Sequence, residues 1–85
     1  MKGKKNLERN EVLANIIEFA SRAYEKSAAE INENTKISEE LGVRSMQRVA
    51  LSSSIENEYD VMIPVARIGQ FETIGNLVDY VMDEM

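Results

Sequence analysis

Few residues in this chain could do chemistry, and one serine stands out among them. The stretch LGVRSMQRVAL, residues 41–51, places Ser45 directly before an apolar run with helical spacing. A serine at the start of a helix is most often a plain N-cap, because its side-chain oxygen accepts a backbone N–H hydrogen bond. The same position suits a covalently attached phosphate, since free N–H groups and the helix dipole favour negative charge there. The residue type alone leaves both interpretations open.

The composition excludes most catalytic and metal chemistry. The 85 residues include no histidine and no cysteine. Without histidine the chain has neither the usual general base nor the commonest metal ligand. Without cysteine it has no thiolate ligand and no disulfide. No nucleophile has an activating base among the motifs, so we expect a protein that is not an enzyme and holds no metal.

The charge distribution points to protein partners. Ten basic and fifteen acidic residues give a net charge of −5, which argues against nucleic-acid binding. Residues 1–29 carry a net +2 and residues 30–85 a net −7, so a basic partner fits the later part of the chain. No segment has the length and hydropathy of a membrane span, and charged residues follow the start MKGKKN, so we expect a cytoplasmic protein.

Apolar periodicity predicts a small all-α bundle. Helical spacing covers Leu7–Tyr24 and Ser45–Tyr59, and Thr73 can cap a last helix that ends near Asp83. Residues 65–71 have room for a short helix only. Residues 27–43 lack a clear period and predict a long loop with one helical turn at residues 38–41. We expect a four-helix bundle, with three longer helices and one short one, in residues 7–85, after a flexible N-terminus in residues 1–6.

The order of these elements and two motifs together resemble the acyl carrier protein family. The pattern L-G-x-x-S-L/M opens the second helix, and E-Y/F-D-x-x-I-P ends it. The resemblance covers most of the chain and rests on spacing rather than on any one motif. The matching residues are Leu41, Gly42, Ser45 and Met46 in the first motif, Val49, Leu51 and Ile55 at the apolar positions after it, Glu58, Tyr59, Asp60, Ile63 and Pro64 in the second motif, and Leu77, Asp79, Tyr80 and Val81 in the last helix.

The resemblance implies a function and a set of site residues. It implies that a phosphopantetheinyl transferase attaches 4′-phosphopantetheine to Ser45, and that acyl-loading and synthase enzymes then use the thioester cargo. We expect a monomer. The residues implied for partner recognition are Arg44, Met46, Gln47, Arg48 and Glu56. Those implied for the core and acyl pocket are Val49, Leu51, Ser52, Ile55, Tyr59, Ile63, Ile68 and Phe71.

The sequence departs from the family beside the serine. Arg44 stands where carriers usually have an aspartate, and Gln47, Arg48 and Ala50 stand where they tend to have acidic residues. These changes favour a specialised pathway in lipid, polyketide or similar biosynthesis over bulk fatty-acid synthesis. For Arg48 alone, a solvated surface charge is the plainer interpretation.

The serine run of the second helix bears on the cargo. We expect a buried, unpaired hydroxyl at Ser52 or Ser53, which would disfavour long saturated chains in the pocket. Two alternatives to an acyl carrier stay open: a module of the same fold that is never modified, and a peptidyl or aminoacyl carrier.

Overall fold

The computed structural model describes residues 8–85, and these residues form helices joined by ordered connections. Leu7 and the N-terminal segment of residues 1–6 lie outside the described residues. The three longer helices are α1, Arg9–Tyr24; α2, Ser45–Tyr59; and α4, Ile74–Glu84. The shorter ones are the 3₁₀-helix η2, Ala28–Glu30; the π-helical turn η3, Ile37–Leu41; and α3, Val65–Ile68. The prediction of a small all-α bundle is confirmed.

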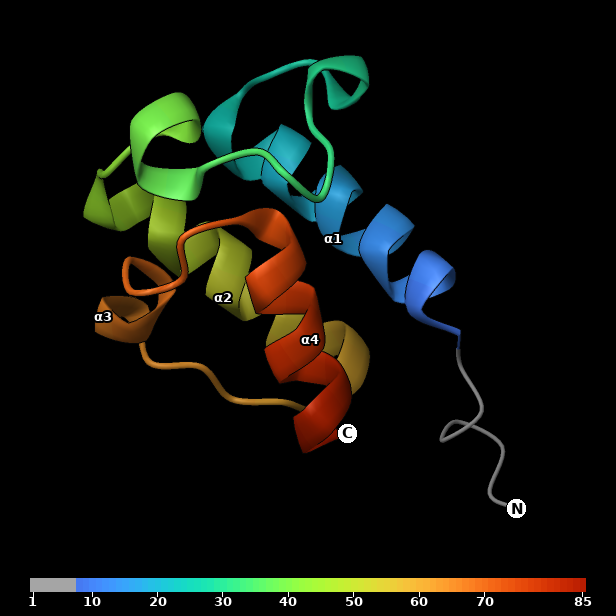
Figure 1. Ribbon diagram of the computed structural model, residues 1–85. Helices are drawn as coiled ribbons and strands as arrows, with labels where there is room; N and C mark the ends of the chain where they lie inside the picture. Colours follow the sequence, from blue (N-terminus) through green and yellow to red (C-terminus); the bar gives the residue numbers. More distant parts are fainter. Residues whose placement is uncertain (1–7) are drawn as a thin grey trace.

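The helix α1 holds the bundle together because it packs against both α2 and α4. The short helix α3 packs against α2, and the connection between α1 and α2 crosses one end of the bundle (Figure 1). None of the described helices is long and apolar enough to cross a membrane.

The core is aliphatic and draws on every longer helix. Four residues of α1 at helical spacing are buried: Val12, Ile16, Ala20 and Tyr24. Burial of a valine or isoleucine side chain stabilises the fold by about 1.5–3 kcal/mol. The fully buried large side chains are Val12, Ile16, Ile37, Leu51, Ile55, Ile63, Ile68, Ile74, Leu77, Val78 and Val81.

Backbone hydrogen bonds fix the long connection to the start of α4. The Ile74 N–H donates to the Thr35 carbonyl at 3.0 Å, and the Ile37 N–H donates to the Glu72 carbonyl at 3.0 Å. The buried Thr35 also accepts a hydrogen bond at its hydroxyl from the Asn32 N–H, at 2.9 Å. The connection therefore has a defined path although it contains little regular helix.

Arg9 adds a side-chain bridge between three parts of the fold. Its guanidinium donates to Asp79 on α4 at 2.7 Å and to Glu33 in the connection at 2.8 Å. These two carboxylates raise the pKa of Arg9 further above its ordinary value. The groups are partly solvated, so the bridge orients the elements more than it stabilises them.

Ser52 is buried, as expected, but its hydroxyl is not unpaired. The Ser52 Oγ–H donates to the Ile63 carbonyl at 2.6 Å, while Ser53 is exposed. The hydrogen bond joins α2 to Ile63, in the segment before Pro64. This segment follows the end of α2. The expected penalty on long saturated cargo loses its basis, because the hydroxyl that was to cause it already has an acceptor.

We predict that Ser52→Ala lowers the free energy of unfolding by about 1–3 kcal/mol, because the Ile63 carbonyl then lacks its donor. Urea unfolding followed by circular dichroism measures the change. Ser53→Ala is the matched control and should change the free energy by less than about 0.5 kcal/mol. Equal effects of the two substitutions would contradict the role given to this hydrogen bond.

Candidate functional site

Ser45 is the first residue of α2, and its side chain is exposed. The N-cap is Arg44, with extended backbone angles, φ −74° and ψ 138°. The interpretation of Ser45 as the N-cap is therefore wrong by one position. A serine at the first helical position does not serve the cap, so its hydroxyl remains available on the surface.

A glycine controls how the chain enters α2. The N–H of Gly42 donates to the Ile37 carbonyl at 3.0 Å and closes the π-helical turn η3. Gly42 has φ 152°, a value that side-chain-bearing residues rarely adopt. The side chain of Gln47 lies directly over Gly42, where a Cβ atom would stand 2.5 Å from Gln47 Oε1. The glycine thus lets the chain turn sharply just before Ser45.

The first turn of α2 presents free backbone donors and no negative charge. The Arg48 N–H is the first to donate within the helix, to the Arg44 carbonyl at 3.1 Å. The N–H groups of Ser45, Met46 and Gln47 precede it and have no intrahelical acceptor. The first turn contains no acidic residue, and Gln47 Oε1 accepts the Arg44 N–H at 3.3 Å. This helix start is suited to an anion.

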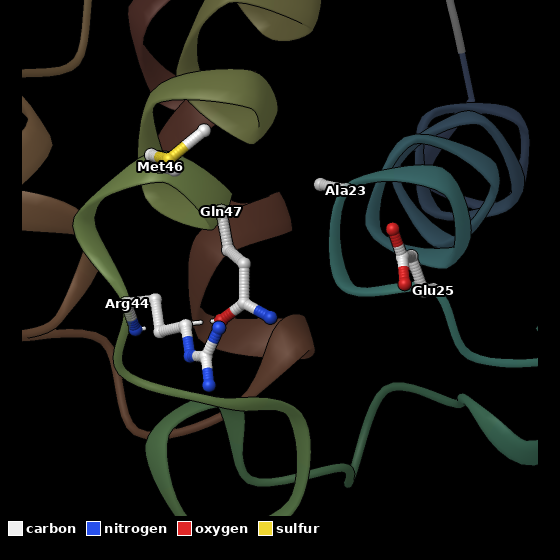
Figure 2. A pocket seen from close by; sticks show the side chains of 5 residues that line it. All are labelled: Ala23, Glu25, Arg44, Met46 and Gln47. Atoms are coloured by element: carbon white, nitrogen blue, oxygen red, sulfur yellow. Dashed lines mark hydrogen bonds between the residues drawn. The ribbon is translucent and has the colours of Figure 1, made fainter.

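A pocket of about 270 Å³ lies beside Ser45, between the end of α1 and the start of α2. The two neighbours of Ser45 in the sequence, Arg44 and Met46, line it together with Gln47. Figure 2 shows these side chains facing Ala23 and Glu25 across the pocket. Sequence reasoning missed Ala23 and Glu25, because no local pattern indicates which parts of α1 and α2 come together.

The residues expected to recognise partners lie on α2 or, for Arg44, at its N-cap, and they differ in exposure. Arg44, Met46 and Glu56 are exposed, and Met46 is the most open of the exposed large apolar side chains, at 83 %. Gln47 and Arg48 are half-buried. Val49 was expected in the core, but 46 % of it is exposed, so it lies on the surface near Met46.

Most residues expected in the core or acyl pocket do lie inside. Leu51, Ile55, Ile63 and Ile68 are buried. Tyr59 and Phe71 are half-buried against the core, and the Tyr59 hydroxyl accepts a hydrogen bond from Asn15 at 2.7 Å. The sequence therefore located the inner face of α2, with Val49 as its one misplaced member.

Arg48 is not a freely solvated surface charge. Its guanidinium lies against Gly69, at the end of α3, where a Cβ atom would stand 2.8 Å from three guanidinium atoms. Its Nε atom is buried without a hydrogen-bond partner among the described residues. The tyrosine hydroxyl of Tyr24 is likewise buried and unpaired there.

The family described as "Phosphopantetheine attachment site" matches residues 14–81 of the chain, which include Ser45 and the whole of α2. The chain belongs to this family. It is therefore a carrier that holds 4′-phosphopantetheine covalently and is modified by a transferase, and it is not itself an enzyme. The resemblance seen in the sequence is confirmed.

Distant relatives of the carrier have acyl carrier protein names. It is 28 % identical to a mitochondrial acyl carrier protein of Saccharomyces cerevisiae, over 89 % of the chain and 64 % of that relative. It is 26 % identical to an acyl carrier protein of Porphyromonas gingivalis, over 85 % of the chain and 92 % of the relative. An acyl carrier protein of Chlorobium phaeobacteroides is 34 % identical over 62 % of the chain and 68 % of its own length. Both bacterial and mitochondrial carriers are thus similar to it.

We predict that the carrier loses stability as the pH rises above 10, in part through Tyr24. Burial raises the pKa of the Tyr24 hydroxyl above its ordinary value of 10.0, and the nearby Arg48 charge lowers it by less. Above pH 10 the unfolded chain releases this proton while the folded carrier retains it, so unfolding becomes more favourable. Tyr24→Phe should flatten the fall in the free energy of unfolding above pH 10, as measured by urea unfolding. Identical slopes for the two proteins would contradict the assignment.

Proposed function

We propose that the carrier holds acyl or related thioester cargo on a 4′-phosphopantetheine arm attached to Ser45 and delivers it to partner enzymes. The observation that supports this most is the exposed Ser45 hydroxyl at the first position of α2, within the segment that matches the family. The arm, when bound, supplies the thiol that holds cargo as a thioester. The protein itself supplies a hydroxyl that a transferase can reach.

The residues around Ser45 fit the phosphate of such an arm. Three free backbone N–H groups at the helix start favour an anion. The guanidinium of Arg44 is adjacent and exposed, and guanidinium groups pair well with phosphate oxygens. The pocket between α1 and α2 borders the same position and gives the part of the arm nearest the protein a surface to lie on.

We expect a broad-specificity phosphopantetheinyl transferase with coenzyme A to add one phosphopantetheine mass to the carrier, and Ser45→Ala to abolish the addition. Intact-protein mass spectrometry measures the change. Ser53→Ala is the matched control, because it removes another exposed hydroxyl from the same helix. It should leave the addition unchanged.

An unmodified wild-type protein would contradict the proposal and favour the alternative of an interaction module that never holds an arm. A peptidyl or aminoacyl carrier is a further alternative that the mass alone does not distinguish. Loading with acyl groups but not with aminoacyl groups by the natural partner enzymes would support the acyl carrier.

We propose that the pathway is a specialised one in lipid, polyketide or similar biosynthesis, because of the charge at the start of α2. Arg44 is exposed next to Ser45, and the first turn of α2 has no acidic residue. In this proposal the partner contacts Arg44, Met46, Gln47 and Arg48. It also contacts Glu56, which is the first acidic residue of α2. Acyl-loading and synthase enzymes with acidic groups at this position would match it.

We expect Arg44→Asp to raise the kcat/KM of a general fatty-acid synthase enzyme for the loaded carrier by roughly tenfold, since 1.4 kcal/mol corresponds to a factor of ten. Steady-state kinetics measures the effect. Arg22→Asp changes the net charge equally on α1 and serves as the control. If the unaltered carrier already works as well as that enzyme's own carrier, the argument for a specialised pathway fails.

We also propose a compartment and an oligomeric state. The proposed compartment is the cytoplasm. The proposed oligomeric state is a monomer, because a net charge of −5 favours separate molecules in solution. Relatives named as mitochondrial make cell fractionation the direct test of the compartment. Light scattering tests the monomer.

A further inference from the structure

The hydroxyl of Tyr24 is an unusual feature of the interior. Tyr24 is the last residue of α1 and is only 3 % exposed. Its hydroxyl has no hydrogen-bond partner in residues 8–85, whereas the hydroxyl of Tyr59 has one. Buried polar groups are nearly always paired, and an orphaned one costs stability. A phenylalanine would fill the same space without that cost, so the hydroxyl calls for an explanation.

A second orphaned donor comes from α2. The Arg48 Nε–H group is buried without an acceptor, and its guanidinium lies against the backbone of Gly69. In the part of the chain that the structure describes, the ion pairs involve Arg9 and Arg22, and none involves Arg48. The edge of a guanidinium offers two parallel donors that match a carboxylate or a phosphate.

The two donors lie on helices that pack against each other, and one of them follows the attachment point by three residues. The charge of Arg48 is near enough to Tyr24 to affect its pKa. Their helices, α1 and α2, pack against each other. Arg48 follows Ser45 by three residues on α2, and residues at this spacing lie on the same side of a helix.

We infer that Tyr24 and Arg48 form a receptor for an anionic oxygen group brought to the protein by the arm on Ser45. The group is either a carboxylate at the far end of the cargo or the phosphodiester of the arm itself. Binding gives both orphaned donors an acceptor and gives the unpaired guanidinium a counter-charge. The inference rests on the proposed attachment at Ser45 and adds a chemical preference to it.

If the bound group is the cargo carboxylate, the receptor favours dicarboxylic cargo over simple fatty acyl chains. A neutral acyl chain leaves the Tyr24 hydroxyl and the Arg48 Nε–H without an acceptor, whereas a carboxylate can accept from both. The pairing is stronger out of water than on the surface, because the local dielectric constant is lower. The contact of the Arg48 side chain with Gly69 then holds the guanidinium in position to bind the anionic group.

Thermal unfolding of the intact carrier in four states tests the inference. The states are the unmodified protein, the protein with a bare arm, and the protein loaded by a transferase with a succinyl or a pentanoyl arm, each confirmed by intact mass. Succinyl and pentanoyl groups have similar lengths but differ in terminal charge. If the cargo carboxylate binds, the succinyl form should have a Tm higher than the pentanoyl form by about 4 °C or more. If the phosphodiester binds, the bare-arm form should exceed the unmodified form by a similar amount.

Five variants separate a receptor from a structural role. Tyr24→Phe and Arg48→Met should each abolish the Tm difference while keeping or raising the Tm of the unmodified protein, because they remove an orphaned polar group. Tyr80→Phe and Arg22→Met are the matched controls and should preserve the difference. Gly69→Ala keeps every charge but displaces the guanidinium, and its φ of −72° suits alanine, so it should reduce the difference without unfolding the protein.

The outcomes distinguish this inference from the proposed function. If the arms are attached but neither Tm difference exists, or if Tyr24→Phe and Arg48→Met leave it unchanged, the receptor is overturned and the carrier function stands. If Ser45 accepts no arm, both are overturned.

Discussion

Three backbone hydrogen bonds between the long connection and the start of α4 determine where the functional helix begins. Ile37 donates to Glu72, Ile74 donates to Thr35, and Gly75 donates to Glu33, at 2.8–3.0 Å. They hold a connection whose longest helical piece has five residues. The attached connection continues into the π-helical turn η3, then to Gly42, and then to Ser45, the first residue of α2. Ser45 can therefore be exposed and still have a fixed position.

A small carrier needs a stable fold and a surface that partners can contact, and opposite faces of α2 meet these two requirements. One face of α2 is buried through Leu51 and Ile55 and ties the helix to α1 and the core. The other face, with Met46 and Val49, is open to partners. In the proposed function the chemistry is confined to the Ser45 hydroxyl at the helix start, so the fold needs no catalytic side chain. We propose that Arg44 changes which partner fits without changing the fold.

The sequence predicted what depends on local patterns, including both ends of α2. It misplaced features that depend on neighbours distant in the chain. Ser52 was expected to be unpaired because its acceptor, the Ile63 carbonyl, follows the end of the helix. Arg48 was taken as solvated because nothing local shows that it reaches Gly69 on α3. The pairing of Arg9 with Asp79, 70 residues away, had no signal in the sequence at all.

Peptide mapping of the modified protein shows directly whether the arm is attached to Ser45. Trypsin cleaves after Arg44 and Arg48, which isolates residues 45–48, a peptide with Ser45 as its one hydroxyl side chain. Fragment ions then assign the modified residue. We expect the phosphopantetheine on Ser45, whether the peptide is released alone or still joined to residues 37–44. Phosphopantetheine on the peptide that contains Ser52, Ser53 and Ser54, or on Ser38, would contradict it.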